Sequence, residues 1–369
     1  MLVAINEHGE YVALTESLTE AALQQLRNSK VYCPHCKKAL ILKAGAIKIP
    51  HFAHTVHTAC TSLFAEGESF AHLLGKQQLY NRLQQLGQEV ELECYLPHLQ
   101  QRPDLLVTKK RLYALEFQCS RIPLSLLAER TKGYEAANIM PVWLLKTPSS
   151  FLGKGTILNI SFTQFHQQFI QHDYLITYAP ETEQFHYFCH ILFLQGNTFL
   201  VRLISLPLKE QVFPFYEPKK MRKEGFNEMF SEYTRYRLKF LKSRLFYSQK
   251  GVNDLFLRAV YELRLPREKL PLFIGIPVVH ASGIPVFSAE WQLLFFYFLY
   301  CHGLSPVQVR EDTIYYFLSW AGLPATEQAC WAVTEYVRLL EALSITEVRT
   351  SFSKEQLIDH VYNQIIAIN

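Results

Sequence analysis

The chain has 369 residues, of which 49% are hydrophobic, and a formal net charge of only +4. This length suits two or three domains, the composition is that of a folded globular protein, and so small a charge does not identify a class of partner. We find neither an apolar stretch of about 18 residues nor a basic region followed by an apolar core at the start, so we expect a cytoplasmic protein without a membrane span.

Residues 1–64 are predicted to form a small module that contains a structural zinc ion. Cys33 and Cys36 form a Cys-x2-Cys pair, and 14 residues separate this pair from His51-x2-His54. Zinc knuckles use this kind of spacing, and a module of this size has too little core to be stable without such support. Unrelated histidines beside a lone cysteine pair are the alternative. The third and fourth ligands stay open among His51, His54, His57 and Cys60.

A helix is predicted over residues 66–86, because its leucines recur near the 3.6-residue period. Glu68, His72 and Lys76 are spaced four residues apart and therefore line one face of that helix. Such a triplet is typical of a solvated polar face. The same triplet would also suit a helix whose face contributes an acidic and a basic side chain to a functional site.

Residues 89–96 alternate between polar and apolar and predict a half-buried strand, and residues 105–118 predict a hairpin. Asp104 precedes the first strand of this hairpin. Glu116 and Gln118 share one face of the second strand, because side chains alternate along a strand. Two carboxylates and an amide would then converge, which is a layout suited to a divalent metal ion. A solvated hairpin end with an edge charge is the alternative.

A further helix after Leu124 and a strand over residues 140–145 complete the order α-β-β-β-α-β. This order resembles the restriction-endonuclease-like PD-(D/E)xK nuclease core, with Pro103-Asp104 and Glu116-Phe-Gln118 in the motif positions. We therefore expect an α/β nuclease-like domain over residues 65–150, between the zinc module and a third domain.

The chain also resembles a more specific family, the CoiA competence proteins, through residues 30–146. The motifs that carry this resemblance are, in chain order, Cys33-x2-Cys36, His51-Phe-Ala-His54, Glu68-Ser-x2-His72-x3-Lys76, Gln101-Arg-Pro-Asp104, Glu116-Phe-Gln-Cys-Ser120, Arg130-Thr-x2-Tyr134 and Trp143. The resemblance implies a protein of naturally transformable bacteria that acts on incoming single-stranded DNA and promotes its recombination into the chromosome.

On this basis we expect Asp104 and Glu116 to hold Mg²⁺ or Mn²⁺, with Glu68 as a further ligand. Gln118 stands where the nuclease motif has a lysine, so Lys76 or Arg130 would have to supply positive charge at the phosphate. If neither reaches the phosphate, the site would bind DNA and metal without cleavage. The residues expected to contact DNA near this site are His72, Arg102, Arg130 and Tyr134.

Residues 151–369 are predicted to form a mainly helical, aromatic-rich domain, with a hairpin over residues 185–206 that turns at Gly196. Ten Lys and Arg but only three Glu lie in the segment 219–250, where aromatic residues are interspersed. Such a basic helix suits single-stranded DNA, although the rings would equally suit a buried face. The cations expected to contact DNA are Arg235, Arg237, Lys239, Lys242 and Arg244.

Three functions follow as hypotheses. The first is a metal-dependent DNA nuclease, and the second is a single-stranded-DNA-binding adaptor without catalysis that recruits a recombinase or the DNA-uptake machinery. The third and weaker hypothesis is a transcription regulator that reads duplex DNA through the cysteine module. A nucleotide cofactor is not expected, because the Gly153-Lys154 segment lacks the remaining residues of a phosphate-binding loop.

Overall fold

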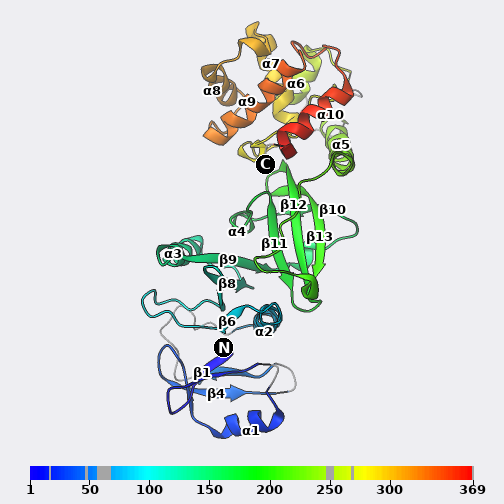
Figure 1. Ribbon diagram of the computed structural model, residues 1–369. Coiled ribbons are helices and arrows are strands. Elements are labelled where there is room, and N and C mark those ends of the chain that lie inside the picture. The colour runs from blue at the N-terminus through cyan, green and yellow to red at the C-terminus, as the bar shows by residue number, and fades with distance from the viewer. Residues whose placement is uncertain (16–17, 46–48, 56–67, 247–252, 267–269, 368–369) are drawn as a thin grey trace. The chain divides into compact units, whose positions relative to one another are not determined.

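The computed structural model describes residues 1–15, 18–45, 49–55, 68–246, 253–266 and 270–367 (Figure 1). The chain divides into two compact units. The first contains residues 1–149, 176–187 and 204–217, and the second contains residues 150–175, 188–203 and 218–369. Short segments of the predicted third domain therefore belong to the first unit.

The N-terminal part of the first unit is a five-stranded antiparallel sheet with strand order β2-β1-β3-β4-β5. Its elements are β1 (Val3–Ile5), β2 (Tyr11–Ala13), α1 (Glu20–Asn28), β3 (Val31–Tyr32), β4 (Ala39–Lys43) and β5 (His51–His54). Thr19 caps α1 by accepting a hydrogen bond from the backbone N–H of Ala22. The turn between β3 and β4 presents the two cysteines of the predicted zinc site.

The nuclease-like part of the first unit has the predicted order α-β-β-β-α-β, which confirms the α/β fold class. Its elements are α2 (Phe70–Gln85), β6 (Glu89–Leu92), β7 (Leu105–Thr108), β8 (Leu112–Gln118), α3 (Leu124–Ala136) and β9 (Ile139–Lys146). Strand β8 pairs antiparallel with β7 and parallel with β9. Helix α2 packs on β6 and β8, and α3 packs on β9.

Two element boundaries differ from the sequence prediction, and both affect the candidate site. Helix α2 begins at Phe70 with Ser69 as its N-cap, so Glu68 precedes the helix. Strand β6 ends at Leu92, because Glu93 adopts a left-handed backbone conformation with φ of 51°. The predicted strand over residues 89–96 is therefore too long at its C-terminal end.

Strands continue well past residue 150. They are β10 (Ile157–Ser161), β11 (Tyr174–Ala179), β12 (Gln184–Gln195) and β13 (Thr198–Pro207), with α4 (Gln164–Gln167) between the first two. In the first unit β11 pairs parallel with β9, and in the second β10 pairs antiparallel with β13. The predicted hairpin is confirmed, and its turn contains Gly196 at a φ of 55°.

The C-terminal part of the second unit is helical, as predicted. Its helices are α5 (Lys223–Phe246), α6 (Leu255–Glu262), α7 (Ser288–His302), α8 (Glu311–Trp320), α9 (Glu327–Ala342) and α10 (Lys354–Tyr362). Short 3-10 helices lie at Ser149–Phe151, Leu208–Glu210, Ala281–Gly283 and Pro306–Gln308, and a π-helix lies at Asn363–Ala367. The rings of Trp291, Phe295 and Tyr336 are buried together, so aromatic side chains form part of the core of this helical region. Across the ranges described, no helix is long and apolar enough to cross a membrane.

Helix α2 approaches the sheet closely at Gly75, which packs against the ring of Phe117 on β8. A Cβ atom at position 75 would lie 2.2 Å from Cε1 of Phe117, far inside van der Waals contact. Glycine is therefore required here by the close approach of helix and strand. The next residue of the helix, Lys76, lies close to the start of β7, where its Nζ atom is 3.6 Å from Oδ1 of Asp104.

We predict that Gly75→Ala lowers the free energy of unfolding by roughly 1–3 kcal/mol, because the added methyl group overpacks the interface. Helix propensity alone predicts the opposite sign, a gain of about 1 kcal/mol. Urea unfolding followed by circular dichroism measures the difference. Gln85→Ala, at an exposed position of the same helix, is the control. The loss should be smaller when Gly75→Ala is made in a Phe117→Leu background, and an unchanged loss would contradict the proposed clash.

Candidate active site

Asp104 lies immediately before β7 and is contacted by both α2 and β8. Its Oδ2 atom is 3.0 Å from Nε2 of His72 and accepts a hydrogen bond of 2.9 Å from the backbone N–H of Phe117. Its Oδ1 atom is 3.6 Å from Nζ of Lys76. Burial alone would raise the pKa of Asp104, but His72 and Lys76 outweigh burial and hold the pKa well below its usual range. Asp104 is therefore ionised and available as a ligand at neutral pH.

Lys76 is completely buried and is surrounded by carboxylates. Its Nζ atom donates to Oε1 of Glu68 at 2.7 Å and also to Glu93. Burial alone would lower the pKa of Lys76, but Glu68 and Glu93 raise it well above its usual value. The same pairing holds the pKa of Glu68 well below its usual range. Lys76 thus keeps its neighbouring carboxylates ionised, and it does not line the pocket described below.

Glu93 is a site residue that sequence analysis missed. Its carboxylate is buried and accepts hydrogen bonds from the backbone N–H groups of Leu2 and Val3 at the start of β1, at 2.9 and 3.2 Å. The alternating pattern placed Glu93 on the same face as Glu89 and Glu91, which are exposed. The left-handed conformation at residue 93 ends that alternation, and no local signal in the sequence indicates it. Glu93 therefore joins the N-terminal sheet to Lys76.

Glu116 on β8 is held by two residues of α3. Arg130 pairs with its carboxylate, and the hydroxyl of Tyr134 donates to the same oxygen, because residues four apart lie on one face of a helix. Burial raises the pKa of Glu116 to about 6, although the Arg130 cation opposes the shift. Tyr134 is fully buried, so its predicted role in contacting DNA is wrong. It is a support for Glu116.

A pocket of about 410 Å³ opens between these elements. Six residues predicted for the site border it, namely Glu68, His72, Arg102, Asp104, Glu116 and Arg130. Gln118 also borders the pocket, but its amide donates to the backbone carbonyl of Ser120 at 2.7 Å. The position of the usual motif lysine is therefore occupied by a side chain that is hydrogen-bonded to its own loop.

Within the pocket, ligand atoms of Glu68, His72 and Asp104 all lie within 4.8 Å of one another. Two carboxylates and an imidazole fit a divalent ion such as Mn²⁺, and carboxylates also suit Mg²⁺. Glu116 borders the same pocket without belonging to this group. His72, which the sequence assigned to DNA contact, thus lies among the possible metal ligands.

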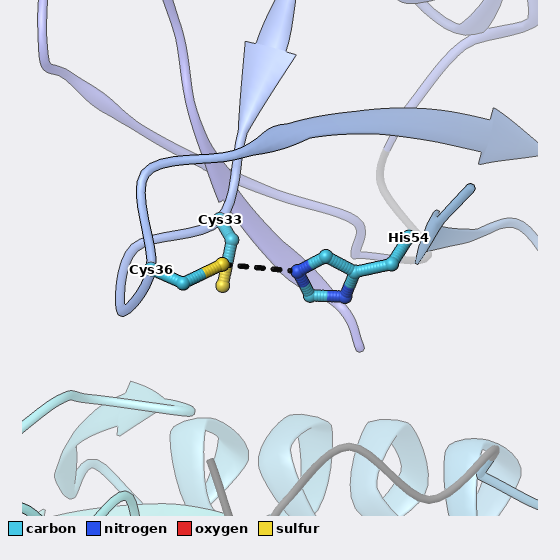
Figure 2. Close-up of side chains that lie close together, drawn as sticks. All are labelled: Cys33, Cys36 and His54. Atoms are coloured by element: carbon cyan, nitrogen blue, oxygen red, sulfur yellow. Dashed lines mark hydrogen bonds between the residues drawn. The ribbon is translucent and has the colours of Figure 1, made fainter. Parts of the chain in front are cut away.

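The second candidate metal centre lies in the N-terminal sheet. Figure 2 shows Cys33 and Cys36 beside the imidazole of His54 on β5, with Sγ of Cys36 3.2 Å from Nε2 of His54. Potential ligand atoms of these three residues lie within 4.8 Å of one another. Burial and then Lys38 hold the pKa of His54 below its usual value, which favours the neutral imidazole that binds metal.

His51 is not part of this group, and its assignment as a zinc ligand stays a prediction. It lies three residues before His54 on the same strand, and side chains three apart on a strand point to opposite faces. Its Nδ1 atom is instead 2.9 Å from the backbone carbonyl oxygen of Ile49. Structural zinc sites almost always have four ligands. The other two predicted candidates, His57 and Cys60, lie outside the described residues.

The cations of helix α5 that were predicted to bind DNA fall into two groups, those paired within the protein and those exposed to solvent. Arg237 is buried and donates to the backbone carbonyls of Leu270, Pro271 and Ile274, so its predicted contact with DNA is wrong. Arg244 is likewise committed to ion pairs with Asp254 and Glu290. The remaining three cations, Arg235, Lys239 and Lys242, are exposed.

Comparisons with known proteins place this architecture in a family. The model described as "Competence protein CoiA, nuclease-like domain" matches residues 68–218, and "Competence protein CoiA, N-terminal domain" matches residues 15–63. Competence protein CoiA of Bacillus subtilis (strain 168) is 30% identical over 307 residues, which cover 79% of this chain and 78% of that protein. The chain belongs to the competence protein CoiA family. No solved structure matches it.

The nuclease-like match of the CoiA family covers both the pocket and the strands β10 to β13 that follow it. It begins at Glu68, the first of the possible ligands, and therefore includes all three residues of the Glu68–His72–Asp104 group. The cysteine pair and His54 fall within the separate N-terminal match. The two candidate metal centres thus belong to different modules of the family.

We predict that the protein binds about one equivalent of zinc and that Cys36→Ser loses it, because a structural site needs a full set of ligands. Elemental analysis of the purified variants measures the metal. Cys94→Ser, which removes a half-buried cysteine outside the group, should retain the zinc. Wild-type protein that is folded and free of zinc would contradict this assignment.

Proposed function

We propose that this protein is a metal-dependent nuclease that acts on incoming single-stranded DNA during natural transformation and so promotes its recombination. The observation that carries the proposal is the group formed by Glu68, His72 and Asp104 in a pocket that Glu116 also borders. Membership in a family with a nuclease-like domain supports it.

Asp104, Glu68 and His72 would hold Mg²⁺ or Mn²⁺, with Glu116 beside them. A bound ion of this kind polarises a phosphate oxygen and acidifies a water molecule. Lys76 contributes indirectly, because its charge keeps Glu68 and Asp104 ionised. The protein thus maintains negative charge at the position where a cation is needed.

Positive charge toward the substrate would come from Arg130 and Arg102, which both border the pocket. Lys76 does not, so it is a poor candidate for the role of the motif lysine. Arg130 is held by Glu116 and lies with its guanidinium carbon 5.4 Å from the centre of the Trp143 ring. A guanidinium in this position can bind a phosphate while keeping a fixed orientation.

The exposed cations of α5 support a second contact with the strand. Arg235, Lys239 and Lys242 follow one another at intervals of four and three residues and therefore share one face of the helix. Phe246, four residues further, is 53% exposed and continues that face. Cations that follow a phosphate backbone together with an aromatic ring for stacking suit single-stranded DNA.

One observation favours a second function, that of an adaptor that binds single-stranded DNA and metal without cleavage and recruits a recombinase or the uptake machinery. Gln118 replaces the motif lysine and is hydrogen-bonded to Ser120. The position of the motif lysine then carries no cation, and cleavage would depend on Arg130 and Arg102.

We predict that the wild-type protein cleaves labelled single-stranded DNA with Mn²⁺ or Mg²⁺, and that Asp104→Asn and Glu116→Gln each lower the rate at least about 100-fold. Each substitution removes a carboxylate while nearly preserving its shape. Glu135→Gln, at an exposed position of α3, is the matched control and should cleave normally. Undiminished cleavage by both variants would rule out this site. Strand binding without any cleavage by the wild type would favour the adaptor.

We predict that the affinity for Mn²⁺ falls as pH decreases below about 6, by up to about tenfold per pH unit for each proton taken up. The pKa of Glu116 is raised to about 6 by burial, so this carboxylate is ionised above that pH and protonated below it. Calorimetric titrations between pH 5 and 7 measure the dependence. In Glu116→Gln the affinity for Mn²⁺ should change less steeply with pH, because one fewer proton is taken up. The same pH dependence in this variant and the wild type would show that Glu116 does not bind the ion.

A further inference from the structure

A residue of the pocket wall, Gln101, carries a buried polar atom that the proposed chemistry does not use. Gln101 lines the pocket and is only 8% exposed, and its Oε1 atom has no hydrogen-bond partner among the residues that the structure describes. A buried amide oxygen without a partner is energetically costly, so such atoms usually accept a hydrogen bond from a water molecule or a ligand.

The position of this amide is determined by the backbone around it. The carbonyl of Gln101 accepts a hydrogen bond of 2.9 Å from the N–H of Leu96, which closes the loop between β6 and β7. A Cβ atom at Gly133 of α3 would lie 2.2 Å from Nε2 of Gln101. Because residue 133 is a glycine, the amide packs directly against the helix. The amide of Gln101 is therefore held in a constrained position at the wall of the pocket.

The walls of the pocket differ in character. Glu68, His72 and Asp104 form an ionic wall, and the rest of the border combines charged and polar residues with a few apolar side chains. The partly exposed apolar residues are Leu99, Ile122 and Leu126. A volume of about 410 Å³ is within the range of small-molecule sites. A matching ligand has an anionic group for the metal, a flat apolar ring and an N–H donor for Gln101.

We propose that this pocket binds one unpaired nucleobase of the strand whose phosphate lies at the carboxylates, and that Oε1 of Gln101 accepts a hydrogen bond from that base. All four DNA bases carry an N–H donor on the edge that pairs in a duplex, so only an unpaired base can offer it. The apolar side chains provide contact with the ring. This subsite rests on the proposed function and gives it a reason to prefer single strands.

The test uses a labelled single strand of thymidines in which one abasic residue is placed at each position in turn. Fluorescence anisotropy with Ca²⁺, a cation that also takes oxygen ligands, measures the affinity of the full chain. We expect one position at which the abasic residue weakens binding roughly tenfold. Gln101→Leu and Leu126→Ala should bind the intact strand more weakly than the wild type does. In both variants, the loss of affinity that the abasic residue causes should be smaller. Leu124→Ala, an exposed position of the same helix outside the pocket, should behave as wild type.

The melting temperature of Gln101→Leu separates loss of a contact from loss of the fold. We expect it to be equal to or above that of the wild type, because the substitution removes a buried polar atom without a partner. Equal affinity at every abasic position, in a protein that shows metal-dependent cleavage, would overturn the subsite alone. A wild-type protein that neither binds nor cleaves the strand would overturn both the subsite and the proposed nuclease. If the abasic residue weakens binding by the same factor in Gln101→Leu as in the wild type, the amide of Gln101 only packs against α3.

Discussion

The buried ammonium group of Lys76 is the interaction on which the rest of the site depends. A charge without exposure to water is very costly unless it is paired and hydrogen-bonded. Lys76 satisfies this requirement with Glu68, Glu93 and Asp104, which come from three separate segments. The close approach of α2 to β8 at Gly75 places the group there. One buried cation thereby determines where three carboxylates lie.

This network also joins the N-terminal sheet to the nuclease-like part. Glu93 contacts Lys76 with one oxygen while its carboxylate accepts hydrogen bonds from Leu2 and Val3. A second link is the N-terminal ammonium of Met1, which lies 2.9 Å from Oε2 of Glu68. A change in the position of β1 would therefore reach the carboxylates through Glu93 and Glu68. The proposed zinc site lies in that same sheet, so bound zinc would act on the candidate site through the stability of the sheet and not as a catalytic group.

The pocket combines two carboxylates in opposite electrostatic environments. Asp104 is kept ionised by His72 and Lys76, whereas burial raises the pKa of Glu116 to about 6 despite Arg130. A divalent ion bound between them would stabilise the ionised form of both. On α5 a similar division separates Arg237, which satisfies buried carbonyls, from the exposed Lys239 and Lys242. Residue type alone does not distinguish these uses of a cation.

Local pattern in the sequence was sufficient for the order α-β-β-β-α-β, the hairpin that presents Asp104 and Glu116, and the cysteine pair. Periodicity and turn residues act over a few neighbouring positions, and they are visible in one chain. The strand parity that separates His51 from His54 was also available, since these two residues are three apart in the sequence. Only the tertiary structure decided the role of Glu93, of Tyr134 and of Arg237. Their partners lie 17 to 91 residues away in the chain. Burial of a polar side chain depends on what folds over it. A strand that ends at Leu92, four residues before the predicted end, leaves no trace in the alternation that precedes it.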